Sequence, residues 1–175
     1  MLEYSTSALV LDAENSGEFD KRVYLYTKEL GKVVAKARSA RKITSKLAAY
    51  LEPFNFVRIR LVEKNGFQIT DALSFGKAEV SRQNADFLQF IKEMTFELQP
   101  DKKLWFFLRK KKFAYRLALK ILGFDPDFAS CQTCGNKFVA YFSKTEQVFL
   151  CRRCTLPRHL SSAAKQEGFS DLIQI

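Results

Sequence analysis

Cys131-Gln-Thr-Cys134-Gly135 and Cys151-Arg-Arg-Cys154 together hold all four cysteines of this 175-residue chain. Two Cys-x-x-Cys pairs that flank a short β-rich insert let each turn offer two thiolates to one tetrahedral ion. Four sulfur ligands leave no position open for water or substrate, so the spacing predicts one structural zinc ion. The alternatives are two disulfides, four unrelated core cysteines or a redox pair, and the redox alternative is weakened because neither pair opens a helix after a strand.

The residues around the cysteines are typical of a small β-ribbon. Gly135 directly follows the second cysteine and suits the left-handed backbone that such a turn usually needs. Segments 138–142 and 147–150 are predicted to be the two strands of a hairpin between the cysteine pairs. A last short helix is expected over 160–175, and His159, the single histidine, is expected at the surface because four cysteines already complete the metal shell.

The composition indicates a folded, basic protein. An apolar content of 47% with 14% aromatic residues is enough for a proper core. The 29 Lys and Arg against 19 Asp and Glu give a net charge of +10, which favours nucleic acid, an anionic membrane or an acidic peptide as a partner. The N-terminus has no basic region before its short apolar run, 8–11, so we expect a cytoplasmic protein without signal sequence or membrane span, in which thiols stay reduced.

Alternating hydrophobicity predicts five strands in the N-terminal part of the chain. These strands are expected over residues 4–12, 22–26, 32–38, 54–63 and 67–75, and a short helix over 46–51. Asn65-Gly66 is the strongest hairpin signal in the sequence. Five strands with a helix between the third and fourth predict an α+β protein with a five-stranded OB-fold barrel over 1–76, followed over 77–175 by a compact helical domain with the zinc ribbon (131–154).

Segment 12–20, between the first two strands, is expected to be an acidic loop. It contains four carboxylates, those of Asp12, Glu14, Glu18 and Asp20. Such a group can bind magnesium for phosphodiester chemistry, but here all four lie on one stretch without a partner histidine or an Asp-x-Asp pattern. A solvated loop is therefore favoured, and we expect the protein not to be an enzyme.

The outward faces of the predicted strands combine cations with aromatic rings. Segment 21–60 contains only two acids, Glu29 and Glu52, among its many basic residues. Cations neutralise phosphates and flat rings stack on bases, so this face is predicted to bind single-stranded nucleic acid. The predicted DNA-binding residues are Arg22, Tyr24, Tyr26, Lys32, Lys36, Arg38, Arg41, Lys42, Lys46, Arg58 and Arg60, with Phe56 as a further outward ring. The alternative is a solvated face whose aromatic residues only pack.

Two long helices are expected after the barrel. The first covers 78–98, and the second begins at an Asp101 cap, continues to Leu122 and ends at Gly123. The run 109–112 of four cations points in all directions, so the helix must bend there or its lysines must extend to solvent. A row of cations on one face of the second helix could meet nucleic acid or hold an acidic peptide, and a solvated helix face is the alternative. The row consists of Arg109, Lys112, Arg116 and Lys120.

The order of these motifs resembles the RecO family of bacterial recombination mediators. The matching segments are Gly17-Glu-Phe-Asp-Lys-Arg-Val23, Tyr26-Thr-Lys-Glu-Leu-Gly-Lys32, Ala37-Arg38, Ser45-Lys46-Leu47, Leu51-Glu-Pro-Phe54, Leu119-Lys-Ile-Leu-Gly-Phe-Asp-Pro126 and the two cysteine pairs. The resemblance covers nearly the whole chain, although the helical region is compressed and little follows the second cysteine pair.

The resemblance implies a non-catalytic, cytoplasmic and nucleoid-associated protein of DNA repair and recombination. Such a protein binds single- and double-stranded DNA, anneals complementary strands and, with RecR, helps to load RecA onto strands coated by single-strand-binding protein. The family's dock for the acidic tail of that coat protein maps onto Lys112, Phe113 and Arg116. The competing hypotheses are a zinc-ribbon RNA-binding or translation-associated module, and a metal-dependent nuclease that uses the acidic loop.

Overall fold

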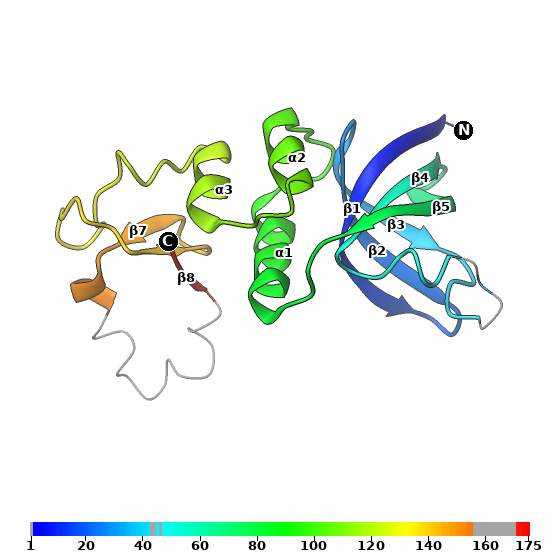
Figure 1. Cartoon of the computed structure of the whole chain (residues 1–175), viewed down its shortest axis with the longest axis horizontal. Coiled ribbons are helices and arrows are strands. Elements are labelled where there is room, and N and C mark those ends of the chain that lie inside the picture. The colour runs from blue at the N-terminus through cyan, green and yellow to red at the C-terminus, as the bar shows by residue number, and fades with distance from the viewer. Residues whose placement is uncertain (1, 43–44, 46, 156–170) are drawn as a thin grey trace. The chain divides into compact units, whose positions relative to one another are not determined.

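The computed structural model describes residues 2–42, 45, 47–155 and 171–175, which form two compact units (Figure 1). The first unit, Met1–Lys112, contains a five-stranded sheet and two helices. The described part of the second unit, Phe113–Ile175, contains one full helix, a helical segment at 152–155, the two cysteine pairs and a small sheet. The predicted α+β class is therefore confirmed. The five strands of the first unit end at Lys77, next to the predicted boundary, and the compact unit continues to Lys112.

The five strands close into a barrel in the order β1-β2-β3-β5-β4. They are β1 (Leu2–Ser16), β2 (Asp20–Thr27), β3 (Gly31–Ala37), β4 (Asn55–Glu63) and β5 (Phe67–Lys77). All neighbouring pairs are antiparallel except β3 with β5, which is parallel. Alternate side chains of every strand fill the interior, among them Val10, Val23, Leu25, Val33, Ile59, Leu61 and Ile69. The five predicted strands are thus confirmed, because a period of two is a local property of the sequence.

The hairpin predicted from Asn65-Gly66 joins β4 to β5. Both residues have positive φ, 53° and 102°, the conformation that this dipeptide tolerates best. Glu63 pairs with Phe67 across the turn. The turn therefore sets the register in which β4 and β5 pair.

Two expectations for the barrel are wrong. The acidic segment 12–20 is not a loop, because β1 continues to Ser16, β2 begins at Asp20 and only a tight turn at Gly17 (φ 72°) separates them. The described residues 47–54, in the region of the predicted helix, form turns with a single hydrogen bond of helical spacing, from the Leu51 N–H to the Leu47 carbonyl at 3.1 Å.

Helices α1 (Arg82–Met94) and α2 (Lys102–Arg109) follow the barrel. Ser81 caps α1 by accepting a hydrogen bond from the Asn84 N–H at 3.2 Å, which starts this helix later than predicted. Asp101 caps α2, as predicted, and its carboxylate accepts from the N–H groups of Lys103 and Leu104 at 2.7 and 3.0 Å. The buried face of α1 consists of Phe87, Leu88, Phe90 and Ile91.

The prediction of a single helix from Asp101 to Leu122 is wrong. The chain instead forms two helices, α2 and α3 (Tyr115–Ile121), and Lys111 adopts a positive φ of 56° between them. The break leaves all four cations of 109–112 exposed, which one continuous helix with a buried face could not do. Gly123 ends α3 with φ 93°, and the Phe124 N–H bonds back to the Leu119 carbonyl at 2.9 Å, so the predicted glycine cap is confirmed.

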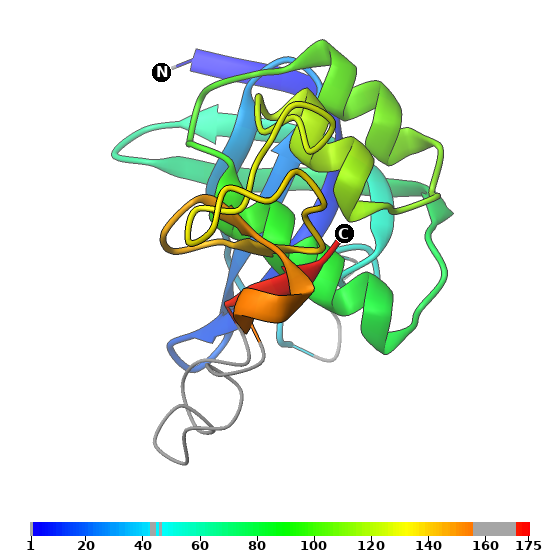
Figure 2. The same cartoon turned by 90° about the vertical axis from the view of Figure 1, so that its left-hand side faces the viewer.

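The second unit has a three-stranded sheet of order β7-β6-β8. Its strands are β6 (Tyr141–Ser143), β7 (Val148–Leu150) and β8 (Leu172–Gln174). The predicted helix over 160–175 is wrong at its end, since 172–174 form a strand; residues 156–170, with His159, lie outside the described residues. Strand β8, red in Figure 2, pairs with β6, and its Leu172 packs against Cys131, Leu150 and Cys151.

Gly31 fixes the start of β3 against the segment that joins α1 to α2. A Cβ atom at Gly31 would lie 2.3 Å from the carbonyl oxygen of Gln99 and 2.7 Å from the nitrogen of Pro100. The same segment pairs with β3 through the Leu98 N–H, which donates to the Lys32 carbonyl at 2.9 Å. The connection between barrel and helices therefore requires a residue without a side chain at this position.

We expect Gly31→Ala to destabilise the first unit by roughly 3 kcal/mol or more, because a left-handed backbone and a backbone clash add together. Gly17→Ala is the matched control: its φ of 72° equals that of Gly31 within one degree, and nothing lies within 4 Å of its Cβ position. The control should be destabilised by only about 1–2 kcal/mol. Urea unfolding followed by the fluorescence of Trp105, the single tryptophan, measures both; equal destabilisation would contradict the close approach.

Candidate nucleic-acid interface and metal centre

The four predicted metal ligands come together in the second unit. The sulfur atoms of Cys131, Cys134, Cys151 and Cys154 all lie within 4.8 Å of one another. The sulfurs of Cys134 and Cys151 are 3.7 Å apart, and no disulfide joins any of the four. Tetrahedral sulfur ligands at a metal distance of about 2.3 Å lie about 3.8 Å from one another, so this cluster has the dimensions of a four-thiolate metal site.

A tight turn and the start of a helix position these thiols. Residues 152–155 are helical and follow β7 directly, so the expectation that neither cysteine pair opens a helix after a strand is wrong for the second pair. Gly135, with φ 72°, donates its N–H to the Cys131 carbonyl at 2.8 Å, and the Cys154 N–H donates to the Cys151 carbonyl at 3.1 Å. Burial alone would raise the pKa of the Cys131 thiol. Hydrogen bonds from backbone N–H groups, above all that of Cys151, outweigh this effect and lower the pKa to about 6. The pKa of Cys154 is raised to about 12 by hydrogen bonds with the thiols of Cys134 and Cys151, because neighbouring sulfurs resist becoming anions without a cation between them.

Seven of the predicted DNA-binding cations are exposed on the barrel and its loops. They are Arg22, Lys36, Arg38, Arg41, Lys42, Arg58 and Arg60. In the described part of the chain, Arg22, Arg58 and Arg60 form no ion pair. Lys36 pairs with Asp20 at 2.9 Å, and Arg41 donates to the carbonyls of Gly17 and Glu18 at 3.1 and 2.9 Å. Lys46 lies outside the described residues.

These cations form two groups instead of the single face predicted over three strands. Arg22 and Lys36 are paired directly across β2 and β3. Arg58 and Arg60 stand two residues apart on β4, whose neighbours in the barrel are β1 and β5. We call these the β2–β3 group, which includes Arg38, and the β4 group. One strand therefore separates the groups on either side of the barrel.

The aromatic residues predicted to stack on bases are largely covered, which corrects the sequence analysis. Tyr26 is 1% exposed, and its hydroxyl accepts from the Asp101 N–H at 3.1 Å; burial raises the pKa of Tyr26 to about 12. Phe56 is also 1% exposed and packs edge-on against Trp105, with ring centroids 6.4 Å apart. Both rings point out of the barrel interior, as the alternation requires, but residues of the α1–α2 region cover them.

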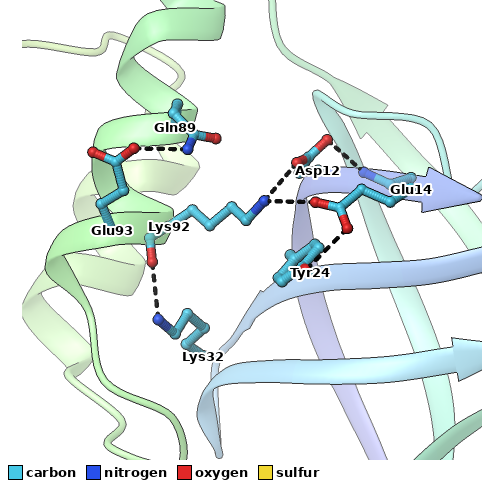
Figure 3. A network of polar contacts seen from close by, with 8 residues as sticks. Asp12, Glu14, Tyr24, Lys32, Gln89, Lys92 and Glu93 are labelled. Atoms are coloured by element: carbon cyan, nitrogen blue, oxygen red, sulfur yellow. Dashed lines mark hydrogen bonds and ion pairs between the residues drawn. The ribbon is translucent and has the colours of Figure 1, made fainter. Parts of the chain in front are cut away.

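Two further residues predicted to bind DNA, Tyr24 and Lys32, contact Lys92 of α1 (Figure 3). Its ammonium donates to Asp12 at 2.7 Å and Glu14 at 3.1 Å, and lies 3.7 Å from the centre of the Tyr24 ring. Its carbonyl accepts from Lys32 at 2.9 Å. Burial alone would lower the pKa of Lys92, but the two carboxylates raise it by more, whereas burial lowers the pKa of Lys32. Both predicted DNA-binding residues therefore have partners inside the protein.

The same network removes the basis for a magnesium site. Asp12 and Glu14 bind Lys92, and Asp20 binds Lys36, which lowers the pKa of Asp20 together with the Ser39 N–H. Within the residues that the structure describes, the four cysteines are the only cluster suited to a metal ion. Segment 12–20 therefore does not form the carboxylate cluster that the nuclease hypothesis requires.

The five residues predicted to bind an acidic tail do not form one helical row. Arg109 and Lys112 belong to the first unit, and Phe113, Arg116 and Lys120 to the second. Arg116 forms an ion pair with Asp127, and Lys120 contacts Asp125 and Asp127 at 3.2 and 3.1 Å. Lys120, followed by Arg116, lowers the pKa of Asp127. Two of the predicted cations are therefore already paired with carboxylates of their own chain.

The first unit also has a pocket that no sequence pattern predicted. It lies beside the β4 group and is lined by Ser7, Lys28, Arg58, Leu73, Phe75, Trp105 and Arg109. Leu73 and Phe75 are 61% and 52% exposed. Their outward positions on β5 follow from its alternation with the buried Ala72, so two large apolar residues on a solvent face are the signal that could have revealed it.

Comparisons with known proteins agree with this architecture. The family model described as Recombination protein O N terminal matches residues 1–75. The DNA repair protein RecO of Thermodesulfovibrio yellowstonii is 30% identical to this chain, over 93% of the chain and 74% of the relative. The chain belongs to the RecO family. This confirms the resemblance seen in the sequence and supports a function in DNA repair.

Other RecO relatives show similar coverage. That of Myxococcus xanthus is 31% identical over 78% of this chain and 65% of its own length, and that of Caldanaerobacter subterraneus is 27% identical over 85% and 70%. The chain thus spans about two thirds to three quarters of the length of these RecO proteins. None of the described helices is long and apolar enough to cross a membrane.

We expect the metal-free protein to bind one Co²⁺ per chain with the absorption of a tetrahedral thiolate site, and Cys134→Ser to weaken this binding strongly. Thr133→Ser, in the same turn, is the control. Unfolding of the barrel, followed by Trp105 fluorescence, should not change in Cys134→Ser, because all four ligands lie in the second unit. Absence of metal binding, or disulfides found by mass spectrometry, would reject the assignment.

Proposed function

We propose that this RecO-family protein is a recombination mediator in DNA repair. It binds single- and double-stranded DNA, anneals complementary strands and, with RecR, helps to load RecA onto strands coated by single-strand-binding protein. It acts without catalysis of its own, in the cytoplasm on the nucleoid. The observation that supports this proposal is a closed barrel whose exposed arginines Arg22, Arg58 and Arg60 have no ion-pair partner in the described structure.

The barrel suits such a protein. We propose that it is an OB-fold, because five strands joined in the order β1-β2-β3-β5-β4 and closed by a parallel β3–β5 pair match that architecture. Its cations are spread along strands instead of being grouped to read base edges, so we infer binding through phosphates with little sequence preference.

The two cation groups support annealing. Arg22, Lys36 and Arg38 extend from β2 and β3, while Arg58 and Arg60 extend from β4, with β1 or β5 between them. Two separate anion-binding surfaces let one barrel contact two strands at once. Neutralising the phosphates of both strands lowers the repulsion that opposes their pairing.

We propose that the metal is zinc and that its role is structural. Four cysteine sulfurs form a closed shell, and Zn²⁺ is the usual ion in such a shell. The ion would connect the turn at 131–135 to residues 151–154 and so fold the segment between them. No position is left for a substrate.

We also propose that the acidic tail of single-strand-binding protein docks on the helical region, with Arg116 and Lys120 contacting its carboxylates and Phe113 and Lys112 nearby in sequence. Asp125 and Asp127 now occupy these two cations, at 3.2 and 3.1 Å from Lys120. Tail binding then means that one set of carboxylates replaces another at Arg116 and Lys120. The internal carboxylates compete with those of the tail for Arg116 and Lys120, which limits the affinity for a tail.

We expect the double variant Arg38→Ala and Arg58→Ala to weaken binding to all single-stranded sequences about equally. The slope of log affinity against log salt should become flatter by roughly 0.7 for each phosphate that the variant no longer neutralises. Arg82→Ala with Lys103→Ala is the control, because these exposed cations lie on the helices outside both cation groups. Fluorescence anisotropy of labelled oligonucleotides at several salt concentrations measures the effect. An unchanged slope would move the DNA site elsewhere.

We expect the protein to anneal complementary oligonucleotides coated with single-strand-binding protein, and to do so less well when the coat protein lacks its acidic tail. Arg116→Ala should weaken binding to a tail peptide by roughly tenfold. Asp127→Asn, which removes the carboxylate partner of Arg116 and one of the two carboxylate partners of Lys120, should tighten it roughly two- to fivefold. Annealing of naked DNA should change little in either variant.

The results separate the alternatives. If Arg116→Ala and Asp127→Asn change binding to DNA and to the tail peptide equally, α3 is part of the DNA surface. If neither variant matters, α3 presents a solvated face. A preference for structured RNA over annealing of DNA would instead favour the RNA-binding or translation-associated module.

A further inference from the structure

The pocket beside the β4 group is lined by residues of β1, β4, β5, α2 and the turn after β2. Arg58 of β4 and Phe75 of β5 form one side, Trp105 and Arg109 of α2 form another, and Lys28 lies in the turn after β2. Its volume is about 510 Å³, within the range of pockets that hold small organic ligands.

The apolar wall of this pocket provides a fixed aromatic ring. Phe75 packs on Phe56 with centroids 6.2 Å apart, and Phe56 in turn packs on Trp105 at 6.4 Å. Phe56 and Trp105 are each 1% exposed, while Phe75 is 52% exposed and has Leu73 beside it on the same face of β5. A ring held by buried neighbours yet half open to solvent is suited to stack on another planar ring.

The polar residues of the pocket are suited to an anion. Lys28, Arg58 and Arg109 all line it, and none of the described residues that line it is a carboxylate. Lys28 has an exposed partner in Glu29 at 3.0 Å, whereas Arg58 and Arg109 have no ion-pair partner in the described part of the chain. A ligand with both a planar ring and oxygen acceptors matches this lining.

We propose that this pocket binds an unpaired nucleobase of single-stranded DNA, stacked on Phe75, with the flanking phosphates on Arg58, Lys28 and Arg109. The inference rests on the proposed function, because it takes DNA as the ligand. Arg60 stands two residues from Arg58 on the same face of β4 and extends the row of cations beyond the pocket. A continuing row favours a polymer with a charge on every unit over an acidic peptide terminus, which needs only a local cluster.

This subsite makes the barrel discriminate between strands. A base within a duplex has its faces covered by neighbouring bases and must be unstacked before it can enter the pocket, which costs free energy. The β2–β3 group makes no such demand, since its cations meet phosphates alone. Single strands are therefore held at the β4 group through base and phosphate together, and duplex through phosphates only.

The single tryptophan of the chain allows a direct test. The full-length protein is titrated with oligothymidylate and with an oligomer of equal length made of abasic units, while Trp105 fluorescence reports pocket occupancy and anisotropy of a labelled oligomer reports total binding. We expect oligothymidylate to change Trp105 fluorescence and the abasic oligomer to bind without doing so. Phe75→Ala should weaken oligothymidylate binding roughly tenfold and leave binding of the abasic oligomer unchanged.

Phe106→Ala is the matched control, since Phe106 of α2 is 53% exposed but does not line the pocket. Phe75→Leu retains apolar packing while it removes the ring, so it should lose the same preference for bases even if Phe75→Ala proves unstable. Arg58→Ala should weaken binding of both oligomers.

Three outcomes would overturn the proposal. If oligothymidylate binds but Trp105 fluorescence stays constant, or if Phe75→Leu matches Phe106→Ala, DNA binding stands and the pocket is not a base site. If an acidic peptide changes the fluorescence and oligothymidylate does not displace it, the pocket serves a peptide. If no oligomer binds at all, the proposed function fails as well.

Discussion

The arrangement of the first unit depends on the ion pairs that the ammonium group of Lys92 forms with two carboxylates of β1. Asp12 and Glu14 stand two residues apart on the same face of β1, where two like charges repel each other unless a cation lies between them. Lys92 contacts both, at 2.7 and 3.1 Å, over the ring of Tyr24. This contact attaches α1 to the barrel and neutralises acids that would otherwise repel DNA.

Attaching α1 also decides which side of the barrel remains open. The chain from α1 to α2 passes over β3 at Gly31 and places Asp101 against the hydroxyl of Tyr26. From there α2 packs Trp105 against Phe56. The helices thus remove two rings from solvent, and the same packing creates a new surface, since Trp105 becomes one wall of the pocket beside Arg58. The packing that covers Phe56 therefore also forms one wall of a better-defined site next to it.

The sequence predicts what is local and misses what depends on packing between distant segments. The strands, the Asn65-Gly66 turn and the Asp101 cap follow from patterns of a few residues, and the cysteine cluster follows from ligand spacing that metal chemistry restricts. Alternation also places Tyr26 on the outer surface of the barrel, but it cannot show that residue 101 covers it. The partner of Asp12 lies eighty residues away, and the helical pattern of 101–122 does not reveal the break at Lys111, which leaves four adjacent cations exposed.

The two units differ in what stabilises them. The barrel has a large interior of aliphatic side chains from all five strands. In the second unit, by contrast, Cys131, Leu150 and Cys151 are the buried centre of a small cluster next to strands of three residues each. A metal ion bound to the four thiolates would add folding free energy to this small cluster. Because all four ligands belong to the second unit, the barrel keeps its cations in place whether or not that ion is bound.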